Sequence, residues 1–255
     1  MKRIISILLL LTLCVGVFAS CDGLTAATVL AQADKALEEA PYTVTMSMDF
    51  ACDNATLNTV FDALSVEIPV TVDGKNVYIN LSTEVMGFTS GMTMTVVDDV
   101  LYSNTTVMNQ SLKLKTTLSA EDYKTFMEEN SSEMPVTADN FESLTLETVD
   151  GKQVISCTGI TTEGLTAMDQ LLSDSLTALG AEAAVGDLSL VITVADGKYE
   201  SMALTATYTV TAGGETHTVS LTMNAKYAYE GVQPITAPAD ADSYKDVSFD
   251  EIIGK

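Results

Sequence analysis

The spacing of apolar side chains changes abruptly near the start of this chain. Within residues 26–40 they recur every three or four positions and form one stripe, with charged residues opposite: Val29, Leu30, Ala33 and Leu37. This spacing predicts an amphipathic helix that Pro41 ends. From Tyr42 the period becomes two, and the apolar positions are Val44, Met46, Met48, Phe50 and Cys52. A period of two predicts a half-buried antiparallel strand.

The same alternation recurs along most of the chain and predicts a series of strands. Its apolar positions are Val66, Ile68, Val70 and Val72; Val77, Ile79 and Leu81; Leu112, Leu114 and Leu118; Leu144 and Leu146; Leu188, Leu190, Ile192 and Val194; Met202, Leu204, Ala206, Tyr208 and Val210; and Val219, Leu221, Met223, Ala225 and Tyr227. Asp-Gly-Lys begins at residues 73, 150 and 196, and Asp-Gly favours hairpin turns. We therefore expect a meander in which strands that follow one another pair.

Two further helices are expected between these strands. Ser119 and Asp122 form a variant of the capping box at the start of residues 120–129. Residues 162–179 carry a second apolar stripe that stops at Gly180 and consists of Leu165, Met168, Leu171, Leu172, Leu176 and Leu179. Such a stripe must pack against the apolar face of a sheet.

These elements predict an α+β fold. We expect about ten antiparallel strands in a strongly curved sheet, a half-open barrel, with about three helices on its concave apolar face. No Pro/Gly/Ser-rich linker interrupts residues 25–255, so they are predicted to form a single domain.

The first 20 residues are typical of a signal peptide. Lys2 and Arg3 precede an apolar run that is too short for a confident membrane span. Phe18-Ala19-Ser20-Cys21 resembles the lipobox of bacterial lipoproteins. The resemblance implies cleavage before Cys21, a diacylglyceryl group on its sulfur, and a short tether over residues 21–24. The alternative is an ordinary cleaved signal followed by an incidental cysteine.

Charge limits the partners of the remaining chain. Removing residues 1–20 from 255 leaves 235 residues, and the loss of Lys2 and Arg3 changes the formal charge from −23 to −25. Such a surface repels nucleic acid and anionic head groups, so nucleic-acid binding is not expected. Attachment to a membrane would then depend on the lipid anchor.

The four cysteines suggest at most one disulfide. Cys14 leaves with the signal and Cys21 is the lipidation site, so Cys52 and Cys157 remain. An exported protein can keep a disulfide. The alternatives are a Cys52–Cys157 bridge or two buried thiols that act as small apolar side chains. No metal motif is present.

The order of elements resembles the LolA/LppX-like lipoprotein superfamily. The local marks are Val29-Leu30-Ala31-Gln32-Ala33 before Tyr42-Thr43-Val44, and the ending Pro238-Ala239-Asp240-Ala241-Asp242-Ser243-Tyr244. The resemblance covers residues 24–250 and implies a half-barrel whose hollow holds the acyl chains of lipids or lipoproteins. The resemblance carries over no catalytic residue. This chain departs from the superfamily in having no Trp.

The resemblance makes the apolar face a candidate binding site, and several methionines on it suit flexible acyl chains. The candidate ligand-binding residues are Met46, Met48, Phe50, Ile79, Leu81, Leu112, Leu114, Met168, Leu172, Leu190, Ile192, Leu204, Tyr208, Leu221 and Met223. The alternative is a methionine-filled core without a ligand.

No catalytic or metal site is predicted. His217, the single histidine, begins a strand, and no nucleophile motif or phosphate-binding glycine loop accompanies it. Asp98-Asp99 is interpreted as a turn, and Asp240 and Asp242 lack the spacing of a calcium loop. We expect no enzyme and no cofactor.

The leading hypothesis is a lipoprotein on the outer face of the bacterial cytoplasmic membrane that binds acyl chains of a lipid or lipoprotein. The alternative is an envelope sensor or scaffold that binds a protein partner through its sheet edge or loops and has no ligand cavity.

Overall fold

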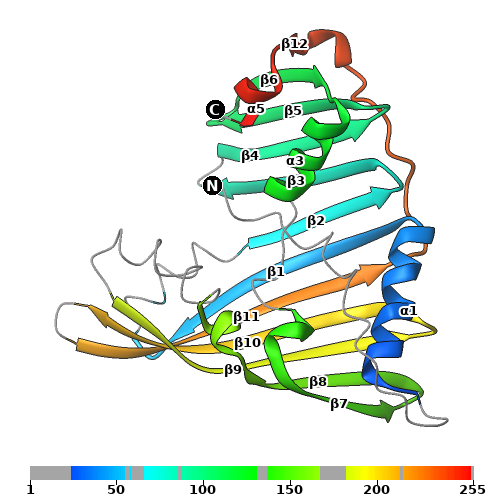
Figure 1. Ribbon diagram of the computed structural model, residues 1–255. Helices are drawn as coiled ribbons and strands as arrows, with labels where there is room; N and C mark the ends of the chain where they lie inside the picture. Colours follow the sequence, from blue (N-terminus) through cyan, green and yellow to red (C-terminus); the bar gives the residue numbers. More distant parts are fainter. Residues whose placement is uncertain are drawn as a thin grey trace.

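One open sheet of 12 strands forms the centre of the molecule (Figure 1). The computed structural model describes residues 24–54, 58, 66–85, 88–130, 137–166, 182–212 and 215–253. The strands are β1 (Tyr42–Cys52), β2 (Val66–Asp73), β3 (Asn76–Val85), β4 (Phe88–Val97), β5 (Val100–Val107), β6 (Gln110–Thr117), β7 (Phe141–Val149), β8 (Lys152–Ile160), β9 (Glu182–Ala195), β10 (Lys198–Ala212), β11 (Glu215–Ala228) and β12 (Lys245–Asp246).

Two antiparallel meanders join in the middle of this sheet. The strand order is β12-β6-β5-β4-β3-β2-β1-β11-β10-β9-β8-β7. Strands that follow one another pair as predicted within β1 to β6 and within β7 to β11, whereas β6 and β7 do not pair. β1 and β11 connect the two meanders through pairs such as Met46↔Ala225. β12 lies parallel to β6, which makes the sheet mixed. The meander and the α+β class are therefore confirmed.

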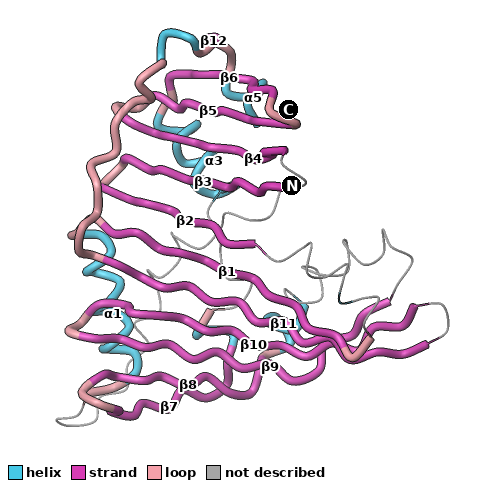
Figure 2. The backbone as a smooth tube through the Cα atoms, turned by 180° about the vertical axis from the view of Figure 1, so that it is seen from behind, coloured by secondary structure: helices cyan, strands magenta, loops and turns pink. Residues whose placement is uncertain are grey.

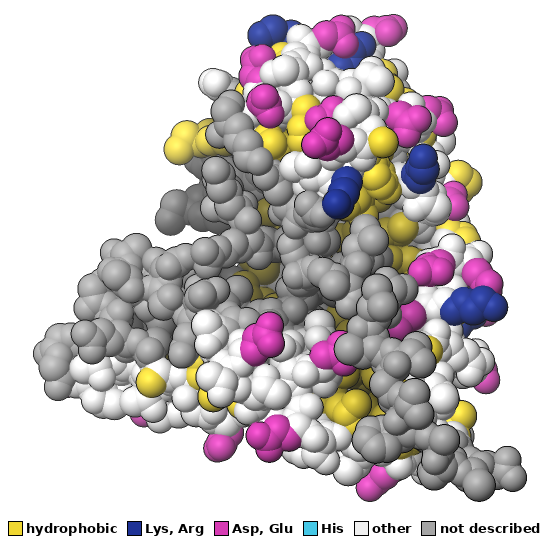
Figure 3. Space-filling model, viewed as in Figure 1, with side chains coloured by type: hydrophobic (Ala, Val, Ile, Leu, Met, Phe, Trp, Pro, Cys, Tyr) yellow, Lys and Arg dark blue, Asp and Glu magenta, His cyan; other side chains and the backbone are white. Residues whose placement is uncertain are grey.

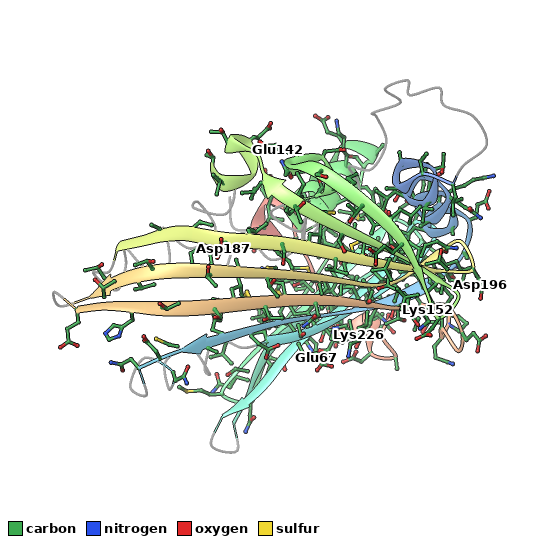
Figure 4. The ribbon with its side chains drawn as sticks, turned by 90° about the horizontal axis from the view of Figure 1, so that it is seen from below. Glu67, Glu142, Lys152, Asp187, Asp196 and Lys226 are labelled. Carbon is green, nitrogen blue, oxygen red and sulfur yellow. The ribbon has the colours of Figure 1, made fainter. Side chains whose placement is uncertain are left out.

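The expected half-open barrel is wrong, and so is the count of ten strands. β12 and β7 are the two edges of a sheet that neither curls nor closes. The sheet twists instead, because the angles between neighbouring strands accumulate, and the strands fan out when seen from below (Figure 4). β12 has only two residues, so no alternation in the sequence could have predicted it.

The described helices include α1 (Ala26–Glu39), α3 (Ala120–Asn130) and α5 (Phe249–Ile253), together with the short 3-10 helices η1 (Ala138–Asn140) and η2 (Ala241–Ser243). Of the helix predicted over residues 162–179, the structure describes residues 162–166 as helical, and the rest lies outside the described residues. The predicted cap of α3 is confirmed, because the Asp122 N–H donates to Ser119 Oγ at 3.1 Å and the Ser119 N–H donates to Asp122 Oδ2 at 3.0 Å.

The predicted turns adopt the backbone conformation that their residues favour. Asp98 and Asp99 have φ of 51° and 60°, so the acidic pair forms a turn between β4 and β5. Asp150 and Gly151 also have positive φ, 51° and 79°, and make a two-residue loop between β7 and β8. Asp-Gly is favoured there because both residues tolerate that region.

The helices cover one face of the sheet, called the inner face here, and leave the other without helices (Figures 1 and 2). α1 buries Val29, Leu30 and Ala33 in the core, and α3 adds Phe126 and Met127. The outer face carries the threonine-rich set of side chains predicted from the alternation, including Thr205 and Thr209 of β10, both exposed.

A C-terminal segment, residues 229–246, called the strap here, leads from the end of β11 to the sheet edge at β12. It runs along the ends of strands β1 to β6 and leads to β12 (Figure 2). Lys113 on β6 pairs with Asp240 of the strap. The ring of Tyr244 packs edge-on against Tyr102 of β5, with centroids 5.4 Å apart.

Candidate functional site

The inner face carries a row of side chains that runs from β7 to β6. Register pairs its members strand by strand: Leu146, Ile155, Ile192, Met202, Ala225, Met46 and Ile68 on β7 to β2, and Leu81, Met92, Thr105 and Leu112 on β3 to β6. Extending the β2–β3 register beyond the pair Val70↔Ile79 places Leu81 beside Ile68. We call this set the transverse row. A second row beside it consists of Cys157, Leu190, Leu204, Met223, Met48 and Val66.

Every described residue of the predicted ligand-binding set lies on this inner face. The transverse row contains Met46, Ile192, Leu81 and Leu112, and the second row contains Leu190, Leu204, Met223 and Met48. The same register places the others on neighbouring inner rows: Ile79, Leu114, Phe50, Leu221 and Tyr208. Met168, Leu172 and Cys21 lie outside the described residues.

The transverse row is buried on the central strands, half-buried at Leu146 on β7, and increasingly exposed toward β6. Ile155 and Ile192 are almost fully buried, and Met46 is 9% exposed. Leu81 and Met92 are half-buried, and Leu112 is 58% exposed. Leu112 is open to solvent, because β6 lies next to the edge of an open sheet. Figure 3 shows apolar side chains at the surface on this side of the molecule.

A cluster of tyrosines lies beneath α1 at one end of the inner face. The ring of Tyr227 lies 6.1 Å from that of Tyr42 and 5.6 Å from that of Tyr199, and Tyr42 lies 6.1 Å from Tyr229. The hydroxyl of Tyr42 is buried and has no hydrogen-bond partner in the described part of the chain. Burial raises the pKa of Tyr229 to about 12, so its phenol stays neutral.

Asp34 of α1 faces this cluster. Its carboxylate accepts a hydrogen bond from the Tyr199 hydroxyl. Loss of solvent is the main cause that raises its pKa to about 6, while the Tyr199 hydrogen bond lowers the pKa and Glu38 and Asp139 raise it. The apolar spacing of α1 gives no sign of this contact, because Asp34 belongs to the charged side opposite the apolar stripe.

Cys52 and Cys157 are free thiols, so the structure does not contain the disulfide considered from the sequence. β11, β10 and β9 separate the strands β1 and β8 that carry them. Adjacent strands lie about 4.8 Å apart, which places β1 and β8 far beyond disulfide range. Burial raises the pKa of Cys157 to about 11, which makes this thiol unreactive at neutral pH.

His217 and the acidic pairs remain surface features in the structure. His217 Nδ1 lies 3.3 Å from Asp53 Oδ1, and its Nε2 lies 3.7 Å from Glu215 Oε2. Asp240 is paired with Lys113. Within the described ranges no three His, Cys, Asp or Glu side chains are placed to hold a metal ion.

A groove of about 380 Å³ lies on the opposite face, between the strap and the strands β1 to β3. Its walls include Thr43, Thr71 and Tyr78 from the sheet and residues 230–236 from the strap. Glu230 is its one charged lining residue. The alternation of the strands predicted polar residues here, but the strap that makes the groove had no signal in the sequence.

Comparisons with known proteins give no family. No family model and no curated protein matches the sequence. A crystal structure of the ywiB protein from Bacillus subtilis aligns with a TM-score of 0.18 at 9% identity, over 74% of this chain and 92% of that one. A structure of MucB in complex with MucA(peri) aligns with a TM-score of 0.12 at 8% identity, over 84% and 100%. Similarities this weak support no argument about fold or function.

The described helices are all too short or too polar to cross a membrane.

Proposed function

We propose that this protein is a membrane-anchored extracytoplasmic lipoprotein that holds the acyl chains of a lipid or lipoprotein against the inner face of its sheet. The observation that carries the proposal is the exposure of the transverse row. Its residues on β8 to β10 are buried, whereas Leu81 and Met92 keep part of their apolar surface accessible. This accessible apolar surface is available to an apolar ligand, whose burial would remove it from water.

The dimensions of the exposed part suit a long hydrocarbon chain. From Met46 on β1 to Leu112 on β6 the row crosses six neighbouring strands. With about 4.8 Å between strands this distance is about 24 Å. A hydrocarbon core about 30 Å thick gives one acyl chain about 15 Å, so the row is long enough for a whole chain.

The side chains suit an apolar ligand that has no fixed shape. Met46, Met48 and Met223 lie on neighbouring inner positions of β1 and β11, and Met92 lies farther along the transverse row on β4. Methionine adapts to irregular apolar surfaces because its side chain is unbranched and polarisable. Each square ångström of apolar area removed from water would contribute about 25 cal/mol, and no covalent step is needed.

The N-terminal sequence supports a location at a membrane. The lipobox-like Phe18-Ala19-Ser20-Cys21 would place a diacylglyceryl group on Cys21, and two chains anchor a protein stably. The acidic chain has no basic patch in its sequence that would attract anionic lipids. We therefore assign attachment to the outer face of the cytoplasmic membrane to the lipid alone.

Binding of a fluorescent long-chain fatty acid to the purified protein tests this proposal. Met92→Lys places a charge on the transverse row, and we expect it to weaken binding by about tenfold or more because the charge must lose water. Thr93→Lys is the matched control, since Thr93 is the next residue, equally half-buried, and faces the outer side.

Two results would contradict the proposal. One is equal affinity of the two lysine variants for the fatty acid. The other is native mass spectrometry of gently extracted protein that finds no bound lipid and no uptake of added fatty acid.

A further inference from the structure

The two edges of the sheet differ in how they are covered. On the β6 edge, β12 pairs at Leu114 and Lys115, and the Val247 N–H donates to the Lys115 carbonyl at 3.0 Å. α5 also packs against β6. On the opposite edge, β7 pairs with β8 alone among the described strands. Within the described ranges, the protein thus covers one edge with a further strand and pairs no strand with the outer side of β7.

β7 lacks most of the features that prevent an edge strand from pairing, and its one protective feature is the acidic charge of Glu142 and Glu147. Natural edges are protected by short length, by proline, by lysine, by bulges or by a covering element. β7 has nine residues, Phe-Glu-Ser-Leu-Thr-Leu-Glu-Thr-Val, without proline or lysine. Most of its side chains are exposed. An edge of this kind is a template for an added strand.

The two-residue loop shows which backbone groups are available. Val149 and Lys152 flank Asp150 and Gly151 and form the hydrogen-bonded pair that closes such a turn. Pairs in an antiparallel ladder alternate between bonded and non-bonded. The N–H and C=O groups of Thr148, Leu146 and Leu144 therefore point away from β8, toward the open edge.

The side chains of β7 offer different contacts on the two faces. Leu144 and Leu146 are half-buried on the inner face, where an apolar side chain of an added strand would pack beside them. Thr145 and Glu147 are exposed on the outer face. The alternation of β7 therefore selects a partner strand with apolar residues on one side and polar residues on the other.

The charge of this edge determines which partner fits. Glu142 and Glu147 are the charged residues of β7, both are exposed, and Asp139 and Asp150 flank the strand. Figure 4 shows Glu142 on the side of the sheet that carries the helices. A second copy would bring the same carboxylates, and like charges on facing strands are destabilising. A strand with Lys or Arg would place opposite charges beside these carboxylates.

We propose that β7 is a docking edge for an extended, Lys- or Arg-bearing segment of a partner protein, which pairs with the free backbone groups of Leu144, Leu146 and Thr148 as an additional strand. This proposal is independent of acyl-chain binding, which uses the exposed part of the transverse row on β1 to β6. Backbone hydrogen bonds supply affinity, and the carboxylates select a basic segment.

A designed peptide in which valine and lysine alternate serves as the probe for the full chain, with isothermal titration calorimetry as the readout. We expect saturable binding together with slowed amide exchange at Leu144, Leu146 and Thr148. A peptide of the same sequence, N-methylated at alternate residues, keeps its charge and loses its donors. We expect at least tenfold weaker binding of that peptide.

Substitutions in β7 locate the site. Thr148→Pro removes a donor that faces the open edge and leaves the bonded pairs to β8 intact, which edge strands tolerate. In this variant we expect the peptide no longer to slow amide exchange at Leu144 and Leu146. Thr148→Ala should bind the peptide as the wild-type chain does. Glu147→Lys gives a second variant, expected to weaken binding of the lysine peptide and to strengthen binding of the same peptide with glutamate in place of lysine.

Three results would overturn the proposal. Equal binding of the N-methylated peptide would show attraction to the acidic surface alone. Protection confined to other strands would place the site elsewhere. A dimer in sedimentation that Thr148→Pro dissociates would make a second copy the occupant of this edge.

Discussion

Tyr199 on β10 donates a hydrogen bond to the carboxylate of Asp34 on α1, although 165 residues separate the two in sequence. The contact fastens the first helix to the middle of the C-terminal meander. It also places a carboxylate in a site where burial raises the pKa of Asp34 to about 6. The charged form of Asp34 is therefore less favourable in the folded protein than in the unfolded chain.

Asp34→Asn should change how stability depends on pH. Because the pKa of Asp34 is raised from 3.8 to about 6 on folding, the folded state binds more protons between these values. Stability of the original protein should fall as pH rises through this window, and the asparagine variant should lack that decline. Urea unfolding at pH 4 and pH 7 measures this decline. We expect the free energy of unfolding of the wild-type protein to differ by about 1 kcal/mol between the two pH values, after allowance for solvent screening.

Glu67→Gln is the control for this experiment, because Glu67 is an exposed carboxylate on the outer face (Figure 4). It should leave the pH dependence unchanged. If stability depended on pH equally in Asp34→Asn and in the wild-type protein, Asp34 would not be buried between α1 and the sheet in solution.

The assignment of the two faces can be tested on adjacent residues of β10. Leu204 is 0% exposed on the inner face, and Thr205 is exposed on the outer face. Leu204→Ala should destabilise the protein by about 2–5 kcal/mol because it leaves a cavity in the core. Thr205→Ala should change stability by less than about 0.5 kcal/mol. A reversed order of the two denaturation midpoints would mean that the register of β10 is shifted by one residue.

How far the sequence predicts this fold depends on the range of the interactions involved. The alternation in Met202–Val210 predicts which face of β10 is buried, since a period of two is a local property. The Asp-Gly turns likewise predict which strands follow one another in the sheet. The pairing of β1 with β11 and the tyrosine cluster beneath α1 join distant segments, and no local pattern signals them. The inner-face residues of the candidate site follow from parity alone, whereas the exposure of Leu112 depends on its place near a sheet edge.

The two described cysteines should differ in reactivity. In a form that begins after the signal peptide and carries Cys21→Ser, a thiol reagent should modify Cys52 rapidly, because it is only half-buried. Cys157 should react only after unfolding, since burial raises its pKa to about 11. The count of reactive thiols should therefore be one in the native protein and two in denaturant without a reductant. A requirement for reductant would show that a disulfide forms.

The ion pair between Lys113 and Asp240 should hold the strap locally. The side-chain contact with Lys113 lowers the pKa of Asp240, so the pair persists above the ordinary pKa of aspartate and weakens as pH falls below it. Asp240→Asn should speed amide exchange at Val247 without moving the midpoint of global unfolding, because exposed ion pairs contribute little. Asp242→Asn, an exposed neighbour, should have no effect. High salt should reproduce the effect of Asp240→Asn in the original protein.

Gly164→Ala tests whether the start of the helix over residues 162–166 is packed as described. In an open helix this change stabilises by about 1 kcal/mol, because glycine is a poor helix former. Here an alanine Cβ would lie 2.9 Å from Asn140 Cβ and 2.8 Å from Ile160 Cγ1. Asn140 has little freedom to move away, because its Oδ1 accepts a hydrogen bond from the Thr137 N–H at 2.8 Å.

The crowding should exceed the gain in helix propensity, and we expect Gly164→Ala to destabilise the protein by about 1 kcal/mol, since overpacking typically costs about 1–3 kcal/mol. The midpoint of urea unfolding measures the change, with Glu163→Ala at the exposed neighbouring position as the control. A higher midpoint for Gly164→Ala would mean that this helix does not pack against Asn140.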